Sequence, residues 1–82
     1  MAQLKLDRLK ILDLLRQAGA NWPALGTAMG YSPRSGYRLA ADVRQGRPIR
    51  DSRLIKVAQG LSKLLGREVT TDQIVRPMRT RA

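Results

Sequence analysis

Cysteine, histidine and phenylalanine are absent from this 82-residue sequence, and acidic residues are few. Without cysteine the chain forms no disulfide bond and no thiolate metal site, and nothing indicates an oxidising compartment. The six Asp and Glu residues are scattered, with no spacing suited to metal binding or general acid–base catalysis. No glycine-rich phosphate loop follows a strand pattern either. We therefore expect no enzymatic activity, no metal and no cofactor.

Long hydrophobic runs are also lacking. Apolar pairs such as Ile11-Leu12 and Leu14-Leu15 fall far short of the roughly 20 residues needed to cross a bilayer, and the N-terminus has no hydrophobic segment typical of a signal peptide. We expect no membrane partner and a cytoplasmic, nucleoid-associated location. A chain of this length buries enough surface for one core, which predicts one domain over residues 1–77. Residues 78–82 are expected to be a basic, disordered tail.

Positive charge is what the sequence has in excess. Sixteen Lys and Arg residues against six Asp and Glu give a formal net charge of +10, and twelve of the sixteen are arginine. The planar guanidinium group matches phosphate and guanine better than an ammonium group does. A domain this basic is expected to have a polyanionic partner.

Hydrophobic periodicity, together with start and stop residues, predicts an all-α fold: a compact bundle of four helices followed by a short helical turn. The expected helices span residues 6–18, about 23–29, about 33–44, and from a cap at Asp51 or Ser52 to a stop at Gly66. After the last helix, residues 67–69 suit either a short strand or extended chain. The capping-box spacing of Thr70 and Gln73 predicts the final turn, which ends before Pro77.

The apolar positions predict which side chains are buried. In the first helix the apolar residues fall on adjoining helical rows, which predicts that this side faces the core; they are Leu9, Leu12 and Leu15, with Leu4 or with Ile11 and Ala18. The chain has only three aromatic residues, and a core of this size needs their buried area. Trp22 and Tyr31 are therefore predicted to be core residues rather than contact residues.

The third helix is predicted to carry a basic outer face. It opens with Ser32-Pro33, a cap residue followed by proline at the first helical position. The positions expected to face the core are Gly36, Leu39, Ala40 and Val43. The positions expected to face outward are Arg34, Ser35, Tyr37, Arg38 and Ala41. A short helix, a turn at Gly30 and a second helix with such a face are typical of proteins that insert a helix into a DNA groove.

The stretch ALGTAMGYSPRSGYRLAADVRQG resembles the helix-turn-helix of lambda-repressor-like phage and plasmid regulators of the Cro type. The stretch LSKLLGREVTTDQIVRP is similar to the closing helix and turn of that family, including its Ner-like repressors, so the resemblance covers about residues 9–77. Gly26 and Gly36 differ from the family pattern, which has alanine and a β-branched core residue there. Gly36 would let the third helix pack closer to the second, with Trp22 or Tyr31 filling the space.

This arrangement predicts two kinds of DNA contact. The major groove admits an α-helix, and a guanidinium fork can bond O6 and N7 of guanine. The residues expected to read bases are Arg34, Ser35, Tyr37 and Arg38. Helix N-termini attract anions, and arginines at the end of the third helix suit the DNA backbone. The residues expected to contact phosphates are Asn21, Trp22, Ser32, Arg44, Arg47, Arg50 and Arg53. For Arg34 and Arg38, solvation or phosphate contact is an equally good interpretation.

The resemblance implies a transcriptional repressor of a phage, plasmid or mobile-element operon, which binds an operator in double-stranded DNA and blocks polymerase. One helix contacts few base pairs, so we expect a homodimer on a partly palindromic site, with half-sites about one DNA turn, roughly 34 Å, apart. No small-molecule ligand is expected. The segment after Gly66 is the expected dimer surface, although its apolar residues suit the rim of the core equally well; they are Val69, Ile74, Val75 and Met78.

Two other functions fit the same sequence. One is a nonspecific architectural or nucleoid protein that uses its charge without reading bases. The other is an adaptor that binds a protein partner, as an antitoxin does. Competition with random DNA distinguishes the three, because only a sequence-specific regulator stays on its site.

Overall fold

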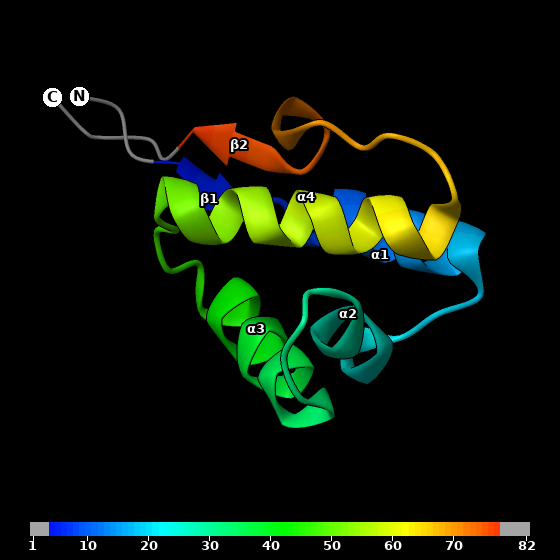
Figure 1. Cartoon of the computed structure of the whole chain (residues 1–82). Helices are drawn as coiled ribbons and strands as arrows, with labels where there is room; N and C mark the ends of the chain where they lie inside the picture. Colours follow the sequence, from blue (N-terminus) through cyan, green and yellow to red (C-terminus); the bar gives the residue numbers. More distant parts are fainter. Residues whose placement is uncertain (1–3, 78–82) are drawn as a thin grey trace, which may run out of the picture.

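Four helices and a two-stranded antiparallel sheet make up the part of the chain that the computed structural model describes, residues 4–77 (Figure 1). In chain order the elements are β1 (Leu4–Leu6), α1 (Arg8–Ala18), α2 (Trp22–Ala28), α3 (Pro33–Gln45), α4 (Asp51–Leu65), the 3₁₀ turn η1 (Thr71–Gln73) and β2 (Val75–Pro77). None of these helices combines the length and apolar character needed to cross a membrane. The predicted tail, residues 78–82, lies outside the described residues.

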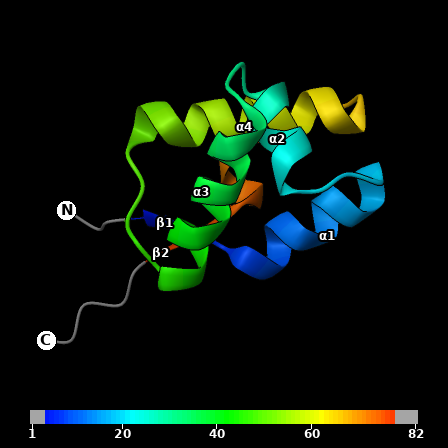
Figure 2. The same cartoon turned by 90° about the horizontal axis from the view of Figure 1, so that it is seen from below.

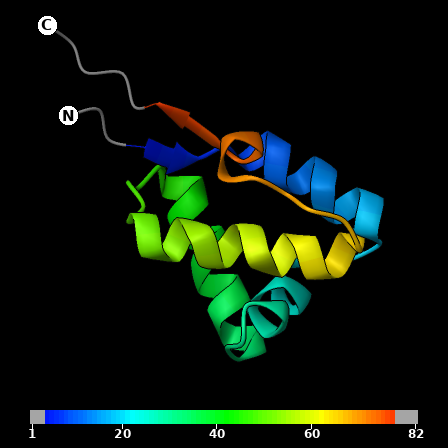
Figure 3. The same cartoon turned by 45° about the horizontal axis from the view of Figure 1, so that its top comes forward.

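α4 lies in the middle of the molecule. In Figure 3 the sheet and α1 lie above α4, α2 lies below it, and α3 crosses behind it, so that α3 extends from α2 toward the sheet (Figures 1 and 3). Side chains from every helix and from β1 meet in one core. Its buried members are Leu6, Ile11, Leu14, Leu15, Leu25, Met29, Leu39, Val43, Leu54, Val57, Ala58, Leu61, Val69 and Ile74. The four predicted helices are therefore confirmed as parts of one compact unit.

The all-α prediction is confirmed only in part, because the mostly helical described chain also contains a short two-stranded sheet. β1 pairs with β2 in the register Leu4 to Pro77, Lys5 to Arg76 and Leu6 to Val75. The other edge of β1 bonds to the connection between α3 and α4, where the Ile49 N–H donates to the Leu4 carbonyl at 3.0 Å. Three residues are too few for alternation to be recognised, and the pairing joins the two ends of the described chain. Local sequence pattern therefore carries no signal for this sheet.

α1 begins at Arg8 instead of residue 6, because the Asp7 carboxylate caps it and accepts the N–H of Leu9 at 3.1 Å and of Lys10 at 3.2 Å. The core side of α1 consists of Ile11, Leu14 and Leu15. Leu9 lies on the opposite side and is 74% exposed, so its prediction as a core residue is wrong. α1 has more leucines than one helix face can bury, and the periodicity alone did not identify the covered face.

The end of the chain follows the prediction more closely. α4 stops at Gly66, which has a left-handed φ of 69°. The turn η1 is present, and the Thr70 N–H donates to Gln73 Oε1 at 3.3 Å. In this described segment residues 67–69 form no strand. Val69 and Ile74 are buried, which assigns them to the core, whereas Met78 lies outside the described residues.

The start of α4 differs from the prediction of a cap at Asp51 or Ser52. Arg50 has the extended backbone of a cap residue, and Asp51 is the first helical residue. The carboxylate of Asp51 therefore lies in the first turn, where the partial positive charge of the helix N-terminus stabilises it.

The aromatic residues divide between core and surface. Trp22 is partly buried and packs against the core, as predicted. Tyr31 is 51% exposed, so its prediction as a core residue is wrong. The preceding Met29 takes the space beneath α4 instead, since a Cβ at Gly60 of α4 would lie 2.7 Å from Met29 Cγ. Tyr31 is left in the turn, facing solvent.

Candidate nucleic-acid interface

α3 is held at the surface with one side buried. Pro33 occupies its first turn, and Gly46 ends it with a left-handed φ of 69°. The buried residues are Gly36, Leu39 and Val43, which are three of the four that the periodicity predicted, whereas Ala40 is half-buried. The helix crosses the molecule beside α2, with its outer side uncovered by the described elements (Figure 2).

Backbone contact between α2 and α3 determines how close the two helices lie. A Cβ at Gly36 would lie 1.8 Å from the Trp22 carbonyl oxygen, and a Cβ at Gly26 would lie 2.5 Å from the Gly36 nitrogen. Any side chain at these positions would push the helices apart. The close approach predicted from Gly36 is confirmed, but the space is filled by the backbone of Trp22 and Pro23, not by the side chain of Trp22 or Tyr31.

Three of the four residues predicted to read bases lie on one exposed face of α3. Arg34, Tyr37 and Arg38 have i, i+3 and i+4 spacing and are all exposed. Ser35 is half-buried, on the side of α3 that faces α4. The exposed face therefore presents two guanidinium groups and a phenol, which are hydrogen-bonding groups of the kind that can bond base edges or phosphates.

Asp42 forms ion pairs with two arginines that lie outside this face. Its Oδ1 lies 3.6 Å from Nη1 of Arg47, and its Oδ2 lies 3.3 Å from Nη1 of Arg53. Two predicted phosphate contacts are thus paired with the same carboxylate, which the sequence analysis did not anticipate. Ion pairs this exposed contribute only about 0–1 kcal/mol. A guanidinium group has five N–H donors, so both arginines keep donors for an external anion.

Arg44 and Arg50, also predicted to contact phosphates, are exposed at the end of α3 and immediately before α4. Arg44 lines a second hollow of about 220 Å³ where α3 ends near β1, together with Lys5, Arg8 and Arg76. Lys5, Arg8 and Arg76 were not predicted to contact DNA, because only the fold brings the two ends of the described chain beside Arg44. Asp7 also lines this hollow, so the cationic surface that continues from α3 to the sheet includes one carboxylate.

The predicted phosphate contacts at helix starts have different environments. Asn21 caps α2, where its Oδ1 accepts the Ala24 N–H at 3.1 Å. Trp22 is the first residue of α2 and packs its ring against the core, so only its backbone is suited to a phosphate. Ser32 caps α3, is exposed, and makes no side-chain capping bond within the described chain. Of the three side chains, the Ser32 hydroxyl is therefore the one most available to bond a phosphate.

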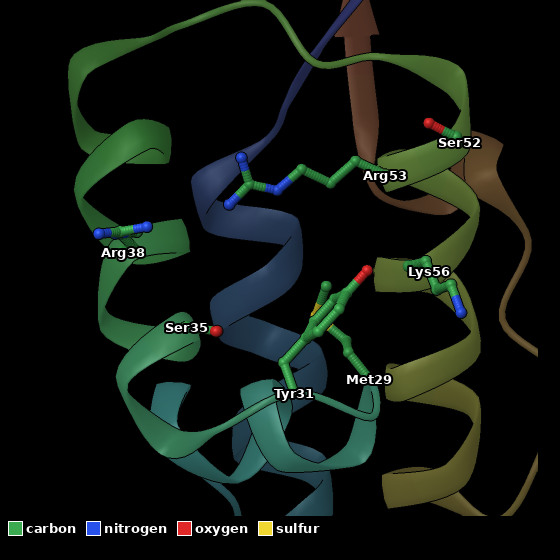
Figure 4. Close-up of a pocket in the computed structure, with 7 residues that line it drawn as sticks. All are labelled: Met29, Tyr31, Ser35, Arg38, Ser52, Arg53 and Lys56. Carbon is green, nitrogen blue, oxygen red and sulfur yellow. The ribbon is translucent and has the colours of Figure 1, made fainter.

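A hollow of about 380 Å³ lies between α3 and α4. Met29, Tyr31, Ser35 and Arg38 line it from the turn and α3, and Ser52, Arg53 and Lys56 line it from α4. Figure 4 shows the Arg53 side chain extending from α4 toward α3 and the Tyr31 ring rising from the turn. Lys56 and Ser52 were not among the predicted site residues, because only the packing of α4 brings them beside Arg38.

No family model, curated protein or solved structure matches the chain. Its function must therefore be inferred from the geometry and charge of the folded domain.

Proposed function

We propose that the protein is a sequence-specific double-stranded DNA-binding transcriptional regulator in which α2 and α3 act as a helix-turn-helix. The observation that carries this proposal is the exposed face of α3, where Arg34, Tyr37 and Arg38 lie together on a helix with its opposite side buried. A single exposed helix fits the major groove, which is about 12 Å wide. The backbone contact at Gly26 and Gly36 supports the proposal because it holds this helix in one position.

In this account α3 lies against base edges and the surrounding residues bind the DNA backbone. Arg34 and Arg38 each bond O6 and N7 of a guanine, which contributes about 1–3 kcal/mol of discrimination per well-placed pair. Ser32, at the start of α3, and Arg50, before α4, contact phosphates on the two sides of the groove. The phosphate contacts orient the domain without carrying sequence information.

We further propose that the regulator acts as a repressor and binds as a homodimer. One α3 contacts few base pairs, whereas two copies about 34 Å apart on a partly palindromic site double the sequence that is read. An operator occupied in this way is blocked to polymerase. The dimer would be visible as two subunits per selected duplex in sedimentation or native mass measurements.

Selection of bound fragments from random duplex DNA tests the proposal. We expect enrichment of one partly symmetric motif and a complex that survives excess random duplex. Enrichment of no motif, with complexes that random DNA removes, would instead support a nonspecific architectural protein, which the spread of cations to Arg44 and Arg76 favours. Failure to bind any duplex at low salt would contradict both DNA functions and leave the protein-binding adaptor.

A further inference from the structure

The hollow between α3 and α4 lies beside the proposed base-reading face and has its own chemistry. Three cationic side chains line it: Arg38 from α3, and Arg53 and Lys56 from α4. Among the described residues lining it, none is acidic. Ser35 and Ser52 add two hydroxyl groups from opposite walls. In Figure 4 the Arg53 side chain extends toward α3, whereas the Lys56 ammonium group points away from it. Cations and hydroxyl donors that line one space from two helices are suited to an oxyanion.

We propose that this hollow binds a phosphate ester. Its volume of about 380 Å³ falls within the range of about 300–1,000 Å³ of pockets that hold organic ligands. An inorganic phosphate ion would fill only part of it. The remaining wall is apolar and aromatic, formed by Met29 and by Tyr31, a residue that is 51% exposed. A phosphate on the cations therefore has a surface beside it for the organic group that the phosphate carries.

Asp42 positions one of the three cations. The Arg53 guanidinium extends toward α3 in Figure 4, and its Nη1 lies 3.3 Å from Asp42 Oδ2. A guanidinium group has five N–H donors, so a single carboxylate contact leaves others for a ligand. Asp42 thus holds Arg53 across the hollow without saturating it, which reduces the side-chain ordering needed when an anion binds.

A phosphate ester reaches this hollow from one of two sources. The first is a free phosphorylated small molecule. The second is a backbone phosphate of DNA next to the groove that α3 enters, and this source rests on the proposed function. Arg38 belongs both to the hollow and to the proposed reading face. A free phosphate ester would therefore compete with DNA for this side chain.

The first arm of the test uses the full-length chain without DNA. Adenosine monophosphate and inorganic phosphate are titrated while backbone amide NMR signals are recorded, with adenosine as the uncharged control. If the source is a free molecule, we expect saturable shifts at Tyr31, Ser35 and Lys56, with tighter binding of the monophosphate than of phosphate. Lys56→Gln should weaken binding about tenfold, as expected when a charge-assisted hydrogen bond is lost. Lys63→Gln, an exposed position elsewhere on α4, should leave binding unchanged.

The second arm replaces single phosphates of a bound duplex by uncharged methylphosphonates. If the source is DNA, one replacement should weaken the wild-type complex about tenfold and have no effect on Lys56→Gln, since the two changes remove the same contact. Coupling in this arm without small-molecule binding assigns the hollow to the DNA backbone. Absence of a Lys56-dependent effect in both arms overturns the proposal. A chain that binds no DNA still tests the hollow through the first arm, so failure of the proposed function is recognised separately.

Discussion

At the residue scale, the position of α3 depends on glycine where α2 and α3 touch. Gly36 was expected to face the core and to allow close packing, and both expectations are confirmed. The neighbour that makes glycine necessary was not predictable, because it is the Trp22 carbonyl and not a side chain. Sequence periodicity reports which face is buried but does not report backbone-to-backbone distances.

Gly36→Ala is expected to destabilise the fold by about 1–3 kcal/mol or more, as overpacking does. In an ordinary helix the same change stabilises by about 1 kcal/mol, but here the new Cβ would lie 1.8 Å from a backbone oxygen. Chemical denaturation followed by circular dichroism measures the change in the free energy of unfolding.

Gly60→Ala is the matched control for this prediction. Its new Cβ would lie 2.7 Å from Met29 Cγ and 3.1 Å from Leu25 Cδ1, two side-chain atoms that can shift, and 3.3 Å from the Met29 backbone nitrogen. We expect the free energy of unfolding to change by less than about 1 kcal/mol, since helix propensity offsets part of the rearrangement. Equal losses in the two variants would contradict the assignment of the α2–α3 contact as a rigid one.

At the element scale, helix ends were predictable where proline or glycine marks them. Pro33 begins α3, and Gly19, Gly46 and Gly66 end three helices with left-handed backbone conformations. Elements without such markers were missed. The sheet formed by β1 and β2 depends on pairing between distant segments, and the start of α1 depends on a cap at Asp7, within the stretch assigned to the helix.

The start of α2 offers a test that separates capping from DNA binding. Asn21→Ala removes the bond to the Ala24 N–H and should lower the free energy of unfolding by about 0.5–2 kcal/mol. Asn21→Asp keeps a good capping group, so stability should be retained. Its added negative charge at the proposed phosphate contact should weaken DNA binding about fivefold, from a repulsion of about 1 kcal/mol in a solvated site.

Thermal unfolding and DNA titration on the same two variants check this prediction. Normal DNA affinity in Asn21→Asp would remove Asn21 from the DNA interface while leaving its capping function intact. Loss of stability in Asn21→Asp would show that the capping geometry of α2 is misassigned.

At the scale of the whole molecule, the net charge predicted a polyanionic partner, but the sequence did not predict how cations are grouped. The hollow between α3 and α4 joins Tyr31, Arg38 and Lys56 only after α4 packs beside the turn. The hollow near the sheet joins Lys5 and Arg44 through β1. Both groupings are tertiary, so composition gave the sign of the surface potential and no more.

Salt dependence reports this surface as a unit. If two subunits neutralise about 6–10 phosphates, affinity should fall by about 10³–10⁵ between about 50 and 200 mM salt. Arg50→Ala should reduce the slope of log affinity against log salt by about one per subunit. Arg16→Ala, in the last turn of α1 and outside the proposed DNA contacts, should leave the slope unchanged. A slope that falls equally in both variants would indicate diffuse attraction without defined contacts.

The most direct test of the central claim is the ratio of affinities for a selected duplex and a random duplex, measured for Arg38→Ala and Arg50→Ala beside the unaltered protein. If α3 reads bases, Arg38→Ala should lower this ratio about tenfold or more, because a bidentate guanine contact contributes about 1–3 kcal/mol of discrimination. Arg50→Ala should weaken both complexes equally and leave the ratio unchanged. Equal behaviour of the two variants would contradict a base-reading function for α3.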